Sequence, residues 1–177
     1  MWCYNLSVTL ESSNANALNI YCDGGARGNP GPAAIGFLIK DGADRLIYKH
    51  SESIGFSTNN SAEYKAVIAA LEYLKTRKEL VSSPTTIQLF LDSRLVVNQL
   101  NGVFKIKDQK MKTLVLAVRN SERELGVLLD EHQTLFASKA PRIRYTLVPR
   151  ELNQEADALV NRALDQEYAS EGDSRLG

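Results

Sequence analysis

The sequence predicts one α/β domain built around a mixed β-sheet, and three observations support this fold class. Three apolar runs near the N-terminus are separated by turn-rich segments, a pattern that predicts antiparallel strands. From residue 60 onward, apolar residues recur at helical spacing instead. Later in the chain, two more strand-length runs alternate with helical segments, as in sheets that contain parallel strands. The predicted order is therefore β-β-β-α-β-α-α-β-α, and 177 residues is a suitable length for one such domain.

The three N-terminal strands are predicted from short apolar runs and from the turns between them. The first run, 18–22, stops at an Asp-Gly-Gly sequence that indicates a turn. A second turn is predicted at 28–32, where glycine and proline are concentrated. Residues 33–39 and 45–51 are then expected to form two strands joined by a hairpin at 41–44.

The later elements are predicted from the change in hydrophobic period and from helix-breaking residues. Alanine, leucine and tyrosine at helical spacing predict a helix to about residue 78, with Asn60 as its capping residue. Gly126 is the expected position of a bend in a long helical stretch. The other predicted elements are a strand at 85–91, a helix from Asp92-Ser93 to Gly102, helix over about 108–138, a strand at 143–148 and a helix from Asn153 to about residue 168. The folded domain is therefore expected at 18–168, between a polar, loosely ordered extension at 1–17 and a polar tail at 169–177.

Composition narrows the class of protein. The 21 basic and 21 acidic residues cancel, so any nucleic-acid-binding surface must be a local patch. No apolar run approaches the roughly 18 residues that span a bilayer, so no membrane association is expected. Residues 1–19 lack the features of a signal peptide, which makes the cytoplasm the expected location. Cys3 and Cys22 are too few for a disulfide framework, and a monomer is the default expectation.

Four acidic residues are predicted at the ends of strands or the starts of helices, where α/β folds place their chemistry: Asp23, Glu63, Asp92 and Asp157. Each one alone is also explained as a turn residue, a helix cap or a partner of the helix dipole. Converging on one place, four carboxylates would repel one another, and divalent cations would relieve this. Oxygen ligands favour Mg²⁺ or Mn²⁺ over zinc, and two such ions can activate water and stabilise the leaving oxygen of a phosphodiester.

Four segments that contain these carboxylates resemble the motifs of type I ribonucleases H. They are Tyr21–Gly36, Thr58–Tyr64, Leu91–Val96 and Val148–Asp157. The last one has the form seen in archaeal members and in bacterial members that lack an extra basic helix. The resemblance extends from about residue 18 to residue 165 with the motifs in the family's order, which makes it far more specific than any single motif.

The resemblance implies a fold, a reaction and a set of functional residues. The fold would be the ribonuclease H-like fold, a five-stranded mixed sheet with its first three strands antiparallel, flanked by helices. The enzyme would use Mg²⁺ or Mn²⁺, two ions per site, to hydrolyse the RNA strand of an RNA–DNA hybrid and leave 5′-phosphomonoesters. The metal-binding and catalytic residues would be Asp23, Glu63, Asp92 and Asp157, and Asn29, Asn59 and Asn60 would contact the minor groove of the hybrid.

Two features depart from the well-studied bacterial members. A histidine expected in the loop before the last helix is absent, and Arg150 in that loop is either a phosphate contact or a surface cation. In place of the basic helix, the segment 104–112 carries four lysines beside Phe104. Phe104, Lys105 and Lys107 are expected to bind the DNA strand, the alternative being a solvated loop with Phe104 in the core.

Two other functions use the same fold. A different nuclease or polynucleotidyl transferase would share scattered carboxylates, but not the asparagine-bearing motifs at Asn29 and at Asn59-Asn60. A non-catalytic hybrid-binding module would not need all four carboxylates, and all four are present. A ribonuclease H is therefore the function that the sequence favours.

Overall fold

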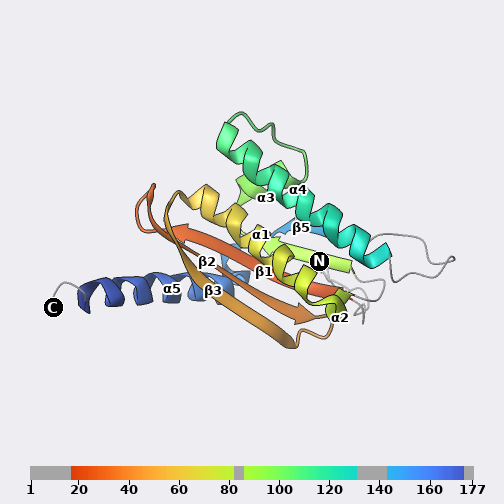
Figure 1. Ribbon diagram of the computed structural model, residues 1–177, viewed down its shortest axis with the longest axis horizontal. Helices are drawn as coiled ribbons and strands as arrows, with labels where there is room; N and C mark the ends of the chain where they lie inside the picture. The colour runs from red at the N-terminus through yellow and green to blue at the C-terminus, as the bar shows by residue number, and fades with distance from the viewer. Residues whose placement is uncertain (1–16, 82–85, 131–142, 174–177) are drawn as a thin grey trace, which may run out of the picture.

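The computed structural model describes residues 17–81, 86–130 and 143–173, and it contains a five-stranded sheet in the order β3-β2-β1-β4-β5 (Figure 1). The strands are β1 (Ala17–Ala26), β2 (Gly31–Asp41), β3 (Leu46–Ser57), β4 (Thr86–Leu91) and β5 (Ile143–Leu147). β1, β2 and β3 pair antiparallel, whereas β4 pairs parallel with β1 and β5 pairs parallel with β4. The predicted mixed sheet with three antiparallel strands at its start is confirmed.

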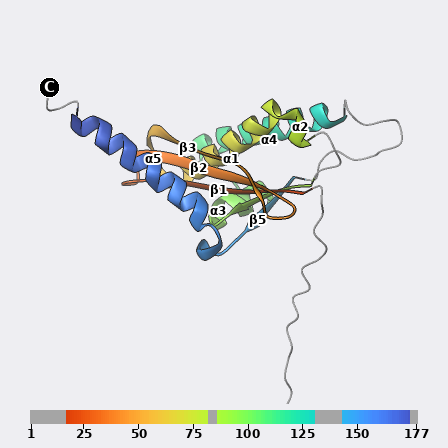
Figure 2. The ribbon, with the colours of Figure 1, turned by 90° about the horizontal axis from the view of Figure 1, so that it is seen from below.

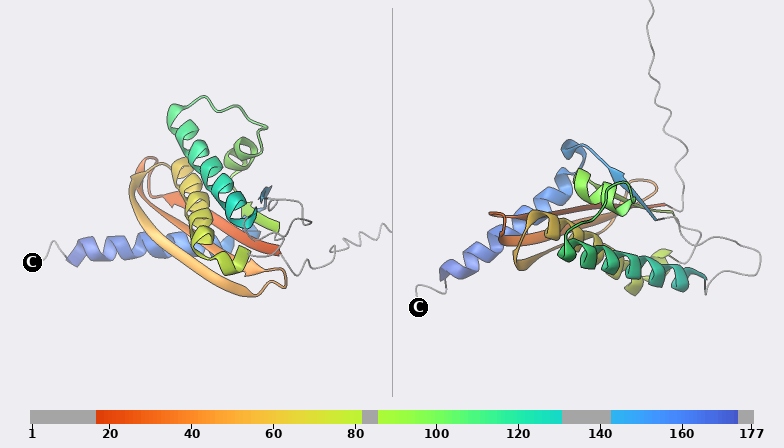
Figure 3. Two further views of the ribbon diagram at one scale, coloured as in Figure 1. Left: turned by 45° about the vertical axis from the view of Figure 1, so that its right-hand side comes forward. Right: turned by 90° about the horizontal axis from the view of Figure 1, so that it is seen from above.

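Helices cover both faces of this sheet. They are α1 (Asn59–Thr76), α2 (Lys78–Val81), α3 (Arg94–Leu100), α4 (Gln109–Asp130) and α5 (Gln154–Asp173), with a short 3₁₀ helix, η1 (Arg150–Leu152), before α5. α1 lies on one face with α4 packed beside it, and α5 crosses the opposite face (Figures 2 and 3). Among the described residues, no helix combines the length and apolarity that crossing a membrane requires.

The core forms because β2 is buried on both faces. Ile35 and Ile39 point to the α1 face and are fully buried there with apolar residues of β1, β4 and α1. The alternate residues Ala34 and Leu38 point to α5, where Ala34 packs with Val160 and Leu38 with Leu159. The period of two along the strand therefore places one helix layer on each side of the central strands.

Several element boundaries differ from those predicted. The Asp-Gly-Gly sequence is not a turn: β1 continues through Gly24 and Gly25, which pair with Ile35 and Ala34 of β2. α4 continues through Gly126 without interruption, from residue 109 to residue 130. The rest of that predicted helical stretch lies outside the described residues.

The capping of α1 is a further correction. The capping residue is Thr58 and not Asn60, because the Thr58 side chain accepts a hydrogen bond from the backbone N–H of Ser61 at 3.3 Å. At the other end of the chain, α5 continues to Asp173, past the predicted end at residue 168. The predicted N-terminal extension falls outside the described residues except for Ala17, which begins β1.

Candidate active site

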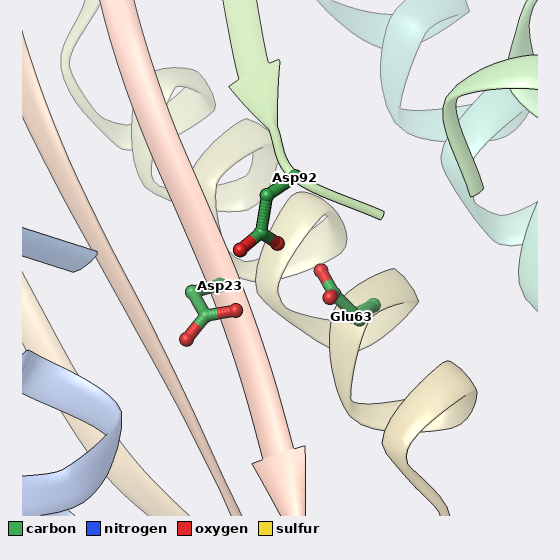
Figure 4. A group of neighbouring side chains, drawn as sticks. All are labelled: Asp23, Glu63 and Asp92. Atoms are coloured by element: carbon green, nitrogen blue, oxygen red, sulfur yellow. The ribbon is translucent and has the colours of Figure 1, made fainter. Parts of the chain in front are cut away.

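Three of the four predicted carboxylates meet at one end of the sheet. Asp23 lies on β1, Asp92 follows β4, and Glu63 lies near the start of α1, with their side chains turned toward one another (Figure 4). One oxygen atom from each residue lies within 4.8 Å of the other two. This spacing would allow all three to coordinate the same cation.

Strand register brings Asp23 and Asp92 together. The last residue pair in the parallel ladder of β1 and β4 is Tyr21 with Phe90, and the two aspartates follow two residues later on each strand. β4 ends at Leu91, so the Asp92 side chain is not part of the sheet and can turn toward β1. Asp23 is thus fixed by its backbone pairing with β2, and Asp92 by its place directly after the last residue of β4.

Glycines allow both helix layers to approach closely beside Asp23. A Cβ on Gly24 would lie 2.2 Å from the backbone carbonyl carbon of Ala62, so only glycine lets α1 bring Glu63 to this point. Gly36 pairs with Asp23 across β1 and β2, and a Cβ there would lie 2.7 Å from Cβ of Leu159 on α5. The Gly-Gly sequence therefore serves close packing at the site, a role that its interpretation as a turn had missed.

The fourth carboxylate, Asp157, lies beside this cluster on α5 but is not one of the three residues within 4.8 Å. The helix that carries it is tied to β1 by Asn153, whose buried side-chain amide donates to the carbonyl oxygen of Cys22 at 3.0 Å. Cys22 directly precedes Asp23, so this bond fixes the position of α5 next to the site. The negative charge of Asp157 acts on Asp23 and contributes to the raised pKa of that carboxyl.

Burial and mutual repulsion make the ionised carboxylates costly. The pKa of Asp23 is raised to about 6, mainly by burial and then by the charges of Asp92 and Asp157. The pKa of Glu63 is also raised well above its usual range, mainly by burial and then by the charges of Asp23 and Asp92. Its Oε2 atom is buried and has no hydrogen-bond partner among the described residues. An unpartnered anionic oxygen in such a cluster fits a hard divalent cation, which would compensate both the charge and the missing contact.

Arg150 is the cation that approaches this cluster most directly in the described part of the chain. Its Nε atom lies 3.6 Å from Oδ2 of Asp92, and Nη2 lies 4.0 Å from Oδ1 of Asp157. The Arg150 side chain is 79% exposed, so it contacts the carboxylates from the solvent side. The structure thus places Arg150 at the site and not on a remote surface.

The asparagines predicted to contact substrate join the loop after β1 to the start of α1. The backbone N–H of Asn59 donates to Oδ1 of Asn29 at 3.2 Å, and Oδ1 of Asn59 accepts from the backbone N–H of Ala26 at 2.8 Å. Asn60 and Asn29 also line a groove of about 490 Å³ together with Lys105, and Lys107 and Lys110 line the same groove. Two of the three asparagines predicted to contact the minor groove and both lysines predicted to contact the DNA strand therefore line one groove.

The lysine-bearing segment lies outside the core. Phe104 is 40% exposed, so it does not fill the core as the alternative interpretation required. Lys105, Lys107, Lys110 and Lys112 are all exposed, and the first three line the groove. We use the name basic loop for residues 104–112, which follow α3 and include the first turn of α4.

Similarity to known proteins extends over nearly the whole chain. The RNase H family model matches residues 15–165, a range that contains all four carboxylates and both asparagine-bearing motifs. The chain belongs to the RNase H family. The four motifs in the sequence are therefore motifs of that family, and the predicted membership is confirmed.

Three similar proteins illustrate the match to this RNase H. Ribonuclease HI of the archaeon Halobacterium salinarum is 34% identical over 91% of this chain and 71% of its own length. A bifunctional protein of Mycobacterium tuberculosis is 34% identical, but the chain spans only 35% of its length. The crystal structure of LC11-RNase H1, isolated from compost by a metagenomic approach, is 37% identical with a TM-score of 0.74 and covers 86% of this chain and 99% of its own. The same LC11 protein has been solved in complex with an RNA/DNA hybrid, at a TM-score of 0.72.

Sequence reasoning missed two asparagines near the site. Asn153 was predicted only as the start of the last helix, but its side chain makes the buried bond to β1. Asn161 was not considered, although its amide donates to Oδ2 of Asp157 at 2.9 Å. The spacing of four residues on a predicted helix was a signal that could have revealed the second of these contacts.

Proposed function

We propose that this RNase H hydrolyses the RNA strand of an RNA–DNA hybrid at a site formed by Asp23, Glu63, Asp92 and Asp157, with Mg²⁺ or Mn²⁺ bound as two ions. The observation that carries the proposal is the cluster of three carboxylates, two of them buried, with the unpartnered oxygen of Glu63. The similarity to a ribonuclease solved in complex with an RNA/DNA hybrid supports this choice of substrate.

The four carboxylates have distinct places in this reaction. Asp23 lies between Asp92 on one side and α5 on the other, so it is the residue suited to be shared between two cations. Glu63 and Asp92 would complete one position, and Asp157 would contribute to the second. Divalent ions held there would lower the pKa of the water that attacks phosphorus and would stabilise the 3′-oxygen that leaves, so that the phosphate would remain on the 5′ end of the downstream product.

Selection of the RNA strand rests on the asparagine-bearing surface. The 2′-hydroxyl group distinguishes RNA from DNA, and an asparagine amide can both donate to it and accept from it. Asn29 and Asn60 line the groove, and Asn59 holds the two segments together through its bonds to Asn29 and Ala26. We expect this surface to contact the minor groove of the hybrid beside the scissile phosphate.

The basic loop would hold the DNA strand. Lys105, Lys107 and Lys110 line the same groove as Asn29 and Thr58, so their ammonium groups are placed to neutralise phosphates of the strand that is not cut. Phe104 is exposed and offers an apolar surface to a sugar or base. Because the protein has no net charge, such a local patch is the means of attracting the polyanion.

Arg150 would act on the RNA side. Its guanidinium group lies at the solvent side of Asp92 and Asp157, where the scissile phosphate must approach, and a guanidinium can donate two hydrogen bonds to phosphate oxygens. We therefore assign it to substrate binding at the site and not to proton transfer.

A hybrid duplex with different fluorescent labels on its RNA and DNA strands tests the proposed function. With Mg²⁺, the RNA label should appear in short products that carry 5′-phosphates, the DNA label should stay full length, and EDTA should stop the reaction. A DNA duplex of the same sequence is the matched control and should remain intact. Cleavage of that DNA duplex at a comparable rate would assign the protein to a different nuclease class, and binding of the hybrid without cleavage would indicate a binding module.

A further inference from the structure

Asp157 differs from the other three carboxylates in how it is held. Its Oδ2 atom accepts a hydrogen bond from Nδ2 of Asn161 at 2.9 Å, and the same nitrogen lies 3.0 Å from the backbone oxygen of Asp157. By contrast, Asp92 faces the guanidinium of Arg150 at 3.6 Å, and Oε2 of Glu63 has no hydrogen-bond partner among the described residues. Asp157 is also the most accessible member of the four, with a side chain that is 40% exposed.

The contact with Asn161 fixes which oxygen faces the site. Asn161 lies one helical turn after Asp157 on α5, so its amide reaches the carboxylate along the helix surface. With Oδ2 engaged there, Oδ1 is the atom that lies toward Arg150, at 4.0 Å from Nη2. A free aspartate on an exposed helix would lose rotamer freedom on binding a cation, and the bond to Asn161 reduces that cost in advance.

An asparagine suits this position because its donor is neutral. A lysine or arginine at residue 161 would bind the carboxylate more strongly but would neutralise part of the charge needed for a cation. An aspartate or glutamate would repel Asp157 and turn its carboxylate away. The amide orients the carboxylate and leaves its charge available.

We propose that Asn161 is a positioning residue that holds Asp157 with Oδ1 directed to the metal site and so sets the affinity of that side of the site for a divalent cation. This inference rests on the proposed function, because it assumes that Asp157 is a metal ligand. Partners that orient a metal ligand typically contribute about 10- to 100-fold to metal affinity or activity. Because Asn161 is exposed, we expect the lower end of this range.

The substitution Asn161→Ala isolates this contact. The side chain is exposed, and its described hydrogen bonds are confined to Asp157, so its removal should leave the core and the free energy of unfolding nearly unchanged. The matched control is Asn98→Ala on α3. Asn98 makes the same kind of bond, from Nδ2 to the backbone oxygen four residues earlier at 2.9 Å, but its partner residue is Arg94 and not a carboxylate.

Titration of the substrate-free protein with Mn²⁺ provides a readout that is independent of activity. The electron paramagnetic resonance signal of the free ion reports how much Mn²⁺ is bound. We expect Asn161→Ala to weaken the more affected Mn²⁺ site about 10-fold, Asn161→Gln to retain most of the affinity, and Asn98→Ala to bind as the wild type does. In cleavage assays, the Mg²⁺ concentration for half-maximal rate should rise by a similar factor, while kcat at saturating Mg²⁺ stays within about twofold of the wild-type value.

The same measurements on Asp157→Asn and on the wild type distinguish failure of this inference from failure of the proposed function. Asp157→Asn should lose the affected Mn²⁺ site together with activity. If Asp157→Asn loses it and Asn161→Ala matches the wild type, the positioning role of Asn161 is overturned and the site assignment stands. If the wild-type protein itself binds no Mn²⁺ and cuts no hybrid, the proposed function fails, and this inference fails with it.

Discussion

The buried carboxylate of Asp23 should make the metal-free protein less stable at neutral pH than a variant that lacks the charge. In the folded protein the pKa of Asp23 is about 6, against 3.8 for an unperturbed carboxyl, because burial and the charges of Asp92 and Asp157 oppose ionisation. Each pH unit between these values corresponds to about 1.4 kcal/mol, so ionised Asp23 lowers the free energy of unfolding by about 3 kcal/mol. The substitution Asp23→Asn should recover about this amount at pH 8.

The pH dependence has a definite sign. Below about pH 4 Asp23 is protonated in both states, and the variant should gain little. Between about pH 4 and pH 6 the unfolded chain releases its proton before the folded protein does, so the stability of the wild type falls as the pH rises. Above about pH 6 the full difference should persist, and it corresponds to a rise of about 6–12 °C in Tm for a chain of this size.

Urea unfolding in EDTA, followed by circular dichroism from pH 4 to pH 8, measures this difference. Glu151→Gln removes an exposed carboxylate outside the cluster and should leave the profile of the wild type unchanged. Adding Mg²⁺ should stabilise the wild type and not Asp23→Asn, so the difference between their free energies of unfolding should become smaller. Equal stabilities of the wild type and Asp23→Asn at pH 8 in EDTA would show that the cluster carries no electrostatic strain, and the reasoning would be refuted.

Three other predictions concern the basic loop, the glycine contact and Arg150. Replacing Lys105, Lys107, Lys110 and Lys112 with Ala should weaken hybrid binding and flatten its log–log salt dependence by about two to four units, with little change in kcat; identical slopes would show that the hybrid is held elsewhere. Gly24→Ala should lower the free energy of unfolding by about 2–3 kcal/mol and lower activity, because the new Cβ would overlap the backbone at Ala62. The control Gly126→Ala would place a Cβ with no neighbouring atom within 4 Å, and it should stabilise α4 by about 0.5–1 kcal/mol in the same urea assay. Arg150→Ala should shift the pH profile of Mn²⁺ affinity to higher pH, because the arginine lowers the pKa of Asp23 and of Glu63; Arg150→Lys should restore most of the profile, and an unshifted profile would separate Arg150 from the site.

Much of the fold could be predicted because its signals are local. Alternating and helical periods report which face of each element is buried, and they placed the strands and most helices near their observed positions. β3 is the exception among the strands, because it continues to Ser57, six residues past its predicted end. The convergence of Asp23, Glu63 and Asp92 was also predictable, since strand ends and helix starts meet at one edge of such a sheet. The motif resemblance supplied the remaining information, namely which of many carboxylates belong together.

The features that were not predicted depend on contacts between distant segments. Two consecutive glycines such as Gly24 and Gly25 are typical of a turn. The strand nevertheless continues through them, and the close approach of α1 to Gly24 explains why no side chain is present there. Asparagine is a common helix-capping residue, but the side chain of Asn153 is oriented by its bond to Cys22, 131 residues earlier in the chain. Thr58 and Asn60 are both good capping residues, and the bond to Ser61 decides between them.

Single-turnover cleavage of the doubly labelled hybrid by wild-type protein and by Asp23→Asn, at saturating Mg²⁺, tests the central claim most directly. The wild type should cut the RNA strand alone. Asp23→Asn should bind the hybrid, unfold at a higher urea concentration in EDTA, and show no cleavage above the level seen with EDTA. An Asp23→Asn variant that keeps most of its Mg²⁺-dependent cleavage would contradict the assignment of the carboxylate cluster as the active site.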